Sequence, residues 1–199
     1  MNFGEIKRRC ILGLVSDVFL TLEEPTGIGY KSMEFIRFQT FTKVLERIER
    51  IMQIFTIGFT GKSAQQFFNL IKEAEVSTIF DVRANNTSQL SGFAKKQDLT
   101  FFLKEILNVR YLELQDLAPD RTLLKKYRSK EVSWEQYSEE YCSMLSRRNI
   151  EKALSPSQLV SGCLLCSEDK PHHCHRRLAG EYLLNHWNDG SRIKLAHLV

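Results

Sequence analysis

The chain has 199 residues, of which 43% are hydrophobic and 26% are charged. This is the usual composition of a globular protein, and it excludes disordered and fibrous classes. The formal net charge of +4 and the sequence pI of about 8.8 permit a nucleic-acid or phosphorylated partner but do not require one.

Residues 1–51 show no alternation of strand and helix patterns. The apolar stretch from Ile11 to Leu22 is too short to span a membrane, and Asp17 interrupts it. No small-residue cleavage site follows, so we expect neither a signal peptide nor a membrane anchor. Apolar residues at helical spacing in 32–51 predict an amphipathic helix. We therefore predict a partly helical N-terminal extension over 1–51 and a separate domain over 52–199.

From residue 53 onward, short β-prone runs alternate with helical patterns. In chain order we expect a strand at 53–57, a helix capped by Ser63 and a strand at 78–82. A helix capped by Asp98 and running to Leu107 follows, then a strand at 109–114 and a helix at 134–145 that Ser133 begins, with a further helical piece to about 154. The last elements are a strand at 160–166, a helix at 175–188 and a strand at 193–197. The run at 160–166 is apolar throughout, which is typical of a strand buried on both faces. The alternation predicts an α/β fold, a three-layer domain with a mostly parallel sheet.

The cysteine content indicates the redox environment. Five cysteines are an odd number in a chain large enough to form a core without disulfides. We therefore expect a cytoplasmic protein with reduced thiols and no membrane partner.

The segment from Cys163 to Cys174 first suggests a metal site, because it contains a Cys-x-x-Cys pair followed by cysteine and histidine. Zinc-binding pairs of this kind occupy tight turns. In an extended strand, Cys163 and Cys166 would lie ~10 Å apart and on opposite faces. We therefore interpret Cys163 as a small buried hydrophobic residue.

Cys166 and Cys174 can approach each other, because Cys166 ends the predicted strand and Cys174 begins the next helix. The N–H groups at a helix N-terminus favour a thiolate, and the charges of His175 and Arg176 add to this effect. The competing interpretation is that Cys174 only caps the helix and that the basic residues are solvated.

Three segments carry a family resemblance: Leu164-Leu165-Cys166-Ser167-Glu168 with Cys174-His175-Arg176-Arg177-Leu178, then Thr56-Ile57-Gly58, and then Phe80-Asp81-Val82-Arg83. Over about residues 53–199, this pattern resembles the domain of unknown function 488 family. The resemblance implies a compact α/β domain whose motif includes Cys166, Glu168, Cys174, His175, Arg176, Asp81 and Arg83, but it implies no agreed reaction. This chain has Phe59-Thr60-Gly61 where the family has a His- or Ser-rich turn. It has Ala84-Asn85-Asn86 where the family has a proline-containing loop.

Each of these motifs follows a predicted strand. Ligands of open parallel sheets bind outside the carboxyl ends of the strands, so we expect one shared site there. We predict an enzyme-like site with catalytic Cys166, Cys174, His175 and Glu168 and substrate-binding Arg83, Arg176, Asp81 and Gly58. Its substrate would be a small anion, such as a nucleotide or a nucleic-acid-derived compound. For Asp81 and Arg83, an ordinary structural ion pair is the alternative.

Three other functions stay open at this stage. A basic run at 121–130 can contact nucleic acid through Lys125, Lys126 and Arg128, and the domain would then be a non-catalytic module that binds nucleic acid or a partner protein. Cys166, Cys174 and His175 can hold a metal ion together with Glu168 or a further histidine. Cys166 and Cys174 can also form a redox pair. The sequence names no cofactor.

Overall fold

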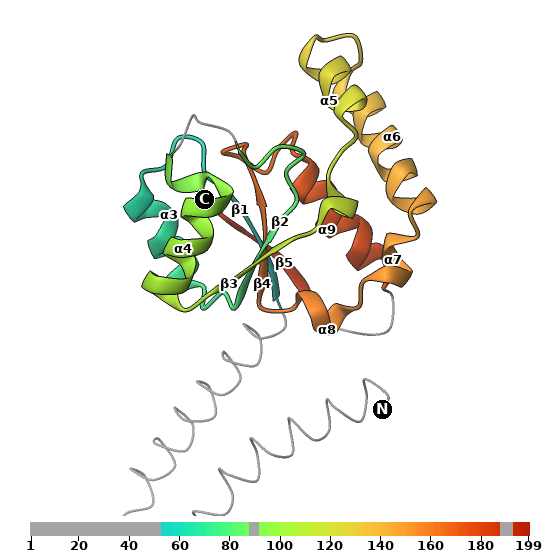
Figure 1. Cartoon of the computed structure of the whole chain (residues 1–199). Coiled ribbons are helices and arrows are strands. Elements are labelled where there is room, and N and C mark those ends of the chain that lie inside the picture. The colour runs from blue at the N-terminus through green and yellow to red at the C-terminus, as the bar shows by residue number, and fades with distance from the viewer. Residues whose placement is uncertain (1–52, 88–91, 188–192) are drawn as a thin grey trace, which may run out of the picture. The chain divides into compact units, whose positions relative to one another are not determined.

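The computed structural model describes residues 53–87, 92–187 and 193–199, so the predicted N-terminal extension lies outside the described residues. Five parallel strands form one sheet in the order β3-β2-β4-β1-β5 (Figure 1). Their bounds are Gln53–Gly58 for β1, Thr78–Asp81 for β2, Arg110–Glu113 for β3, Gly162–Cys166 for β4 and Lys194–Leu198 for β5. The predicted α/β class is confirmed, and all five strand predictions fall on observed strands.

Helices cover both faces of the sheet. On one face lie α3 (Ala64–Glu73) and α4 (Lys96–Leu107), and on the other lie α6 (Trp134–Arg147), α7 (Ile150–Ala153), α8 (Pro156–Leu159) and α9 (His175–His186) (Figure 1). Two short 3₁₀ helices, η1 (Gly92–Ala94) and η2 (Gln115–Leu117), precede α4 and α5 (Arg121–Arg128). The result is the predicted three-layer arrangement.

The strand order explains which helices share a face. The chain moves from β1 across to β2 and β3, and then reverses direction to reach β4 and β5. Connections between parallel strands are right-handed, so a reversal of direction places the later helices on the opposite face. The reversal also inserts β4 between β1 and β2, and it thereby brings the ends of all three strands together.

Two apolar clusters, one on each face, hold the layers together. Along β4, Cys163 and Leu165 belong to the cluster under α3 and α4, while Leu164 belongs to the cluster under α6 and α9. All five residues of β4 are buried, as its apolar sequence predicts. By contrast β3, at one edge of the sheet, is mostly exposed, and the side chain of Leu112 is 48% exposed.

The helix N-termini follow the predicted capping pattern in two cases out of three. Ser63 and Ser133 each cap a helix with a complete capping box, formed with Gln66 and Gln136 respectively. The prediction that Asp98 caps a helix is wrong, because α4 begins at Lys96 and Asp98 lies in its first turn. The acidic side chain still interacts favourably with the helix dipole there, which explains why the sequence pattern placed it near the start.

Residues 121–128 of the basic run form α5, which the strand–helix pattern did not predict. This helix runs beside α6 and projects with it away from the sheet (Figure 1). Tyr127 attaches it by packing against the rings of Trp134 and Tyr137, with centroid distances of 5.6 and 4.8 Å. No helix in the described part of the chain is both long and apolar enough to cross a membrane.

Candidate functional site

A polar cavity of about 470 Å³ opens at the carboxyl ends of β2 and β4. This volume lies in the range of small-molecule sites. The described segments that line it are the loop after β2, the end of β4 with the loop that follows, the first residue of α9 and one face of α5. The lining residues are Arg83, Ala84, Asn85, Thr87, Arg121, Leu124, Lys125, Arg128, Cys166, Ser167, Glu168 and His175.

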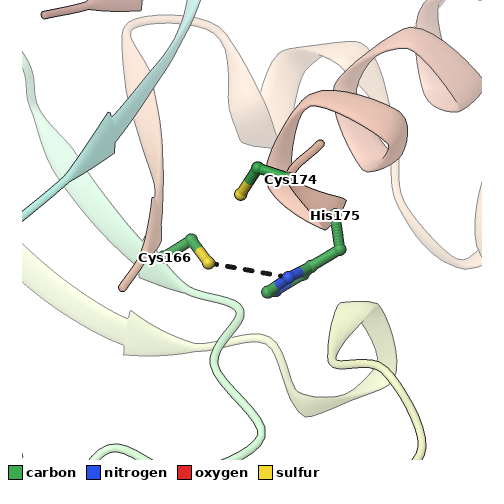
Figure 2. A group of neighbouring side chains, drawn as sticks. All are labelled: Cys166, Cys174 and His175. Carbon is green, nitrogen blue, oxygen red and sulfur yellow. Dashed lines mark hydrogen bonds between the residues drawn. The ribbon is translucent and has the colours of Figure 1, made fainter. Parts of the chain in front are cut away.

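Cys166 and His175 form the centre of this site. The Sγ atom of Cys166 lies 3.5 Å from Nδ1 of His175 (Figure 2). On the other side of the ring, Nε2 of His175 lies 2.9 Å from the carbonyl oxygen of Val82. A carbonyl can only accept a hydrogen bond, so Nε2 carries a proton. This bond fixes the ring and leaves Nδ1 directed at the thiol.

The surroundings of Cys166 favour its thiolate form. Burial alone raises the pKa of a thiol, but the neighbouring Cys174 thiol and the positive charge of His175 together hold the pKa of Cys166 well below its ordinary value. Burial alone would lower the pKa of His175. The charge of Cys166 and the hydrogen bonds to Cys166 and Val82 outweigh burial and raise the pKa of His175 above its ordinary value. The two shifts support a thiolate–imidazolium pair.

Cys174 differs from Cys166 although it lies beside it. The possible ligand atoms of Cys166, Cys174 and His175 all lie within 4.8 Å of one another (Figure 2). The proximity of Cys166, followed by burial, raises the pKa of Cys174 far above its ordinary value. Cys174 occupies the N-cap position of α9, but its side chain makes no capping hydrogen bond. Of the two cysteines that the sequence could not rank, Cys166 lines the cavity and contacts His175, and this placement favours Cys166 over Cys174 as the thiolate.

Asp81 and Arg83 form a buried ion pair. Arg83 donates from Nε to Asp81 at 2.8 Å and from Nη2 at 2.6 Å, and Tyr111 of β3 also donates a hydrogen bond to Asp81. The Arg83 guanidinium lies over the ring of Phe59, with Cζ 5.3 Å from the ring centroid. Asp81 is fully buried and outside the cavity lining, whereas Arg83 lines it. Asp81 therefore orients Arg83, and only Arg83 faces the cavity.

Arg176 shapes the loop after β4 instead of facing the cavity. Its side chain is fully buried and donates to the carbonyl oxygens of Glu168 and Asp169 and to the sulfur of Cys174. Gly58 serves the same loop, because a Cβ atom at this position would lie 1.6 Å from the carbonyl oxygen of Glu168. Both residues hold the loop that follows Cys166. Their predicted role in binding substrate stays a prediction.

Glu168 is exposed and lines the cavity. Cys163, three residues before Cys166, is fully buried among apolar side chains, and burial raises its pKa. Its place inside β4 separates it from the cluster of Cys166, Cys174 and His175, as the strand geometry predicts.

Sequence reasoning missed the contribution of α5. Arg121, Lys125 and Arg128 face the same cavity as Cys166, although they were assigned only to a basic run. Their spacing of four and then three residues was the available signal, because such residues share one face of a helix. The neighbouring Lys126, which the sequence grouped with them, lines a different groove beside Gln136 and Glu140 of α6.

Comparisons with known proteins agree with the motif analysis. The sequence pattern described as "Domain of unknown function DUF488" matches residues 63–183, which is more than half of the chain. Neither the curated proteins nor the solved structures include a match. The matched range contains every predicted site residue except Gly58, and the chain therefore belongs to the family defined by the domain of unknown function DUF488.

Proposed function

We propose that this protein is a thiol-dependent enzyme that acts on a small anionic substrate, with a nucleotide or nucleic-acid-derived compound as one form of it. One observation carries the proposal. The Cys166–His175 pair opens into the same cavity as Arg83 and the basic face of α5. A nucleophile and anion-binding groups thus share a space of small-molecule size.

The chemistry follows from the proton positions. The Cys166 thiolate attacks an electrophilic carbon or phosphorus atom of the bound substrate, and a bond from sulfur to that atom forms. The bond to the leaving group then breaks, and the leaving group takes a proton from Nδ1 of the His175 imidazolium. Water releases the product from sulfur in a second step, and the proton from water passes to neutral His175, either directly or through Glu168. Cysteine returns as the thiolate and histidine as the imidazolium.

The proposed roles of the other residues follow from their contacts. Arg83 is fixed by Asp81 and by a bond of 2.8 Å from Nη1 to the carbonyl oxygen of Ala94, so it holds the anionic part of the substrate in a defined place. Cys174 supports the thiolate of Cys166. Arg176 and Gly58 position the loop.

The pH dependence of Cys166 alkylation tests the proposal. Iodoacetamide is uncharged, so its rate of reaction follows the thiolate fraction of each cysteine, which peptide mass spectrometry resolves. We expect Cys166 to react at pH 6.5 with a rate already close to its plateau. Free cysteine is only about 1% ionised at that pH. A rate for Cys166 that rises with pH as free cysteine does would overturn the proposal.

A metal centre is the second candidate. Cys166, Cys174 and His175 offer three ligand atoms in one cluster, and the bond from Nε2 of His175 to a backbone carbonyl is also the arrangement that orients metal-bound histidines. Protein produced with added zinc would then contain one equivalent of metal, and Cys174→Ser would remove it. In that case Cys166 would resist alkylation until a chelator is added, which separates this function from the first.

A cytoplasmic location is part of the proposal. The proposed nucleophile requires a reduced thiol, and Cys142, Cys163, Cys166 and Cys174 are all free. A reducing compartment keeps such thiols in this state.

A further inference from the structure

The face of α5 that lines the cavity consists of Arg121, Leu124, Lys125 and Arg128. We propose that its three cations select the substrate of the Cys166 site, and that this substrate is a small molecule that carries phosphate. The inference rests on the proposed function and specifies its substrate class.

The first argument is the charge balance of the cavity. Arg121, Lys125 and Arg128 supply three cationic side chains to the lining besides Arg83, whose charge is paired with Asp81, and among the described lining residues they face the carboxylate of Glu168. In the described part of the chain, no ion pair involves Arg121, Lys125 or Arg128. All three side chains are also exposed, so their donors are available to a ligand. A ligand with several negative charges complements this surface better than a monoanion does.

The second argument is geometric. Residues 121, 125 and 128 lie on one side of α5, and this side faces the loop that carries Arg83. Arginine presents forked donors that match phosphate oxygens, and lysine adds a point charge. The cations of α5 and Arg83 thus approach a ligand from two segments, while Cys166 lies in the same cavity.

The third argument favours a small ligand over a nucleic-acid strand. Among the described residues that line the cavity there is no Phe, Tyr or Trp, whereas single strands usually bind by stacking their bases on such side chains. Tyr127 is engaged with Trp134 and Tyr137, and Lys126 lines the other groove. The basic run is therefore divided between two surfaces and does not form one continuous track for a phosphate backbone.

Two alkylating probes test the inference. Iodoacetate and iodoacetamide attack the same thiolate, but only iodoacetate is negatively charged. The rate of iodoacetate divided by the rate of iodoacetamide at Cys166 therefore reports the positive potential of the cavity. This ratio is independent of the pKa of Cys166. We expect a triple variant, R121Q/K125Q/R128Q, to lower this ratio by about ten-fold at low salt. The matched control, K104Q/K126Q/K130Q, removes the same number of charges outside the cavity and should leave the ratio within about two-fold.

A competition experiment identifies the ligand class. Pyrophosphate should slow the alkylation of Cys166 by iodoacetamide in the native protein and in the control variant, and it should lose this effect in the α5 triple variant. Acetate at the same ionic strength should protect far less. The inference is overturned if the α5 variant keeps the native rate ratio and the native protection. It is equally overturned if a single-stranded oligonucleotide protects while pyrophosphate does not.

These outcomes are separable from the test of the proposed function. A Cys166 that ionises like free cysteine rejects the thiol enzyme, whatever α5 does. A Cys166 with a low pKa and an unchanged probe ratio in the triple variant keeps the enzyme and rejects the role of α5.

Discussion

The middle and the end of strand β4 carry the same residue type three positions apart, in opposite chemical environments. Cys163 packs among apolar side chains under α3 and α4, and burial raises its pKa. Cys166 is 3% exposed, yet its pKa is well below the ordinary value because Cys174 and His175 outweigh the effect of burial. Burial therefore does not decide the character of a cysteine in this protein. The partners at the end of the strand decide it.

The largest expected effect is a difference in labelling between these two cysteines. Iodoacetamide near neutral pH should modify Cys166 quickly, because it lines the cavity as a thiolate. Cys163 should react at least about a thousand-fold more slowly than Cys166, because it is fully buried and becomes accessible only when the fold opens. Half-buried Cys142, whose pKa is raised by burial, should lie between them. Peptide mass spectrometry measures all three rates in one sample, and comparable rates for Cys163 and Cys166 would contradict the comparison.

Removal of the His175 imidazolium should raise the pKa of Cys166, toward the raised pKa of Cys163. In His175→Asn, the positive charge that favours the thiolate is lost, so the pKa of Cys166 rises and the midpoint of its pH–alkylation profile moves to higher pH. We expect a shift of about one pH unit or more, which is the usual effect of losing an opposite charge at this distance. His172→Asn is the control, because that histidine is exposed and outside the cavity lining. An unchanged midpoint would show that His175 does not carry the charge.

A hydroxyl at the middle of β4 should affect stability and leave reactivity unchanged. Cys163→Ser places a hydroxyl in an apolar cluster, which should lower the free energy of unfolding by about 1–3 kcal/mol. The alkylation profile of Cys166 should not change. Urea denaturation measures the first quantity, and Cys163→Ala, which adds no polar group, is the matched variant. A native-like stability for the serine variant would mean that Cys163 is less isolated from polar partners than its burial indicates.

The smallest expected effect concerns Cys174. In Cys174→Ala, the thiol beside Cys166 is lost while the charge of His175 remains. A hydrogen bond from a neutral thiol contributes about 1 kcal/mol. The midpoint of the pH–alkylation profile of Cys166 should therefore rise by about half to one pH unit. Circular dichroism would verify that α9, which begins after this residue, keeps its helicity. A shift larger than that of His175→Asn would make the thiol, and not the imidazolium, the main support of the thiolate.

Local patterns in the sequence were sufficient for the fold class and for much of the site. Alternating apolar runs located all five strands, and Ser63 and Ser133 marked helix starts, because capping and burial depend on nearby residues. The motif Cys174-His175-Arg176 placed the candidate site at the loop after β4, because this motif is also a local pattern of neighbouring residues. The start of α4 was misplaced because Lys95 occupies its N-cap without a side-chain hydrogen bond, so no residue of the preferred type marks it.

Roles that depend on contacts between distant segments required the tertiary structure. Arg83 and Arg176 are both basic residues of the motif, but only the fold shows that Arg83 faces the cavity while Arg176 is enclosed by the carbonyls of Glu168 and Asp169. The contribution of α5 likewise depends on its position beside α6, which no local pattern reports.

The sequence by itself thus determined the α/β class, the parallel strands and the cysteine–histidine motif, because hydrophobic periodicity and residue chemistry are local properties. The tertiary structure alone decided that Cys166, and not Cys174, lines the cavity beside His175, that Arg176 supports the loop and that α5 completes the cavity. The physical reason is that pKa values and ligand contacts depend on distances between side chains, and these distances are set only when the strands and helices pack together.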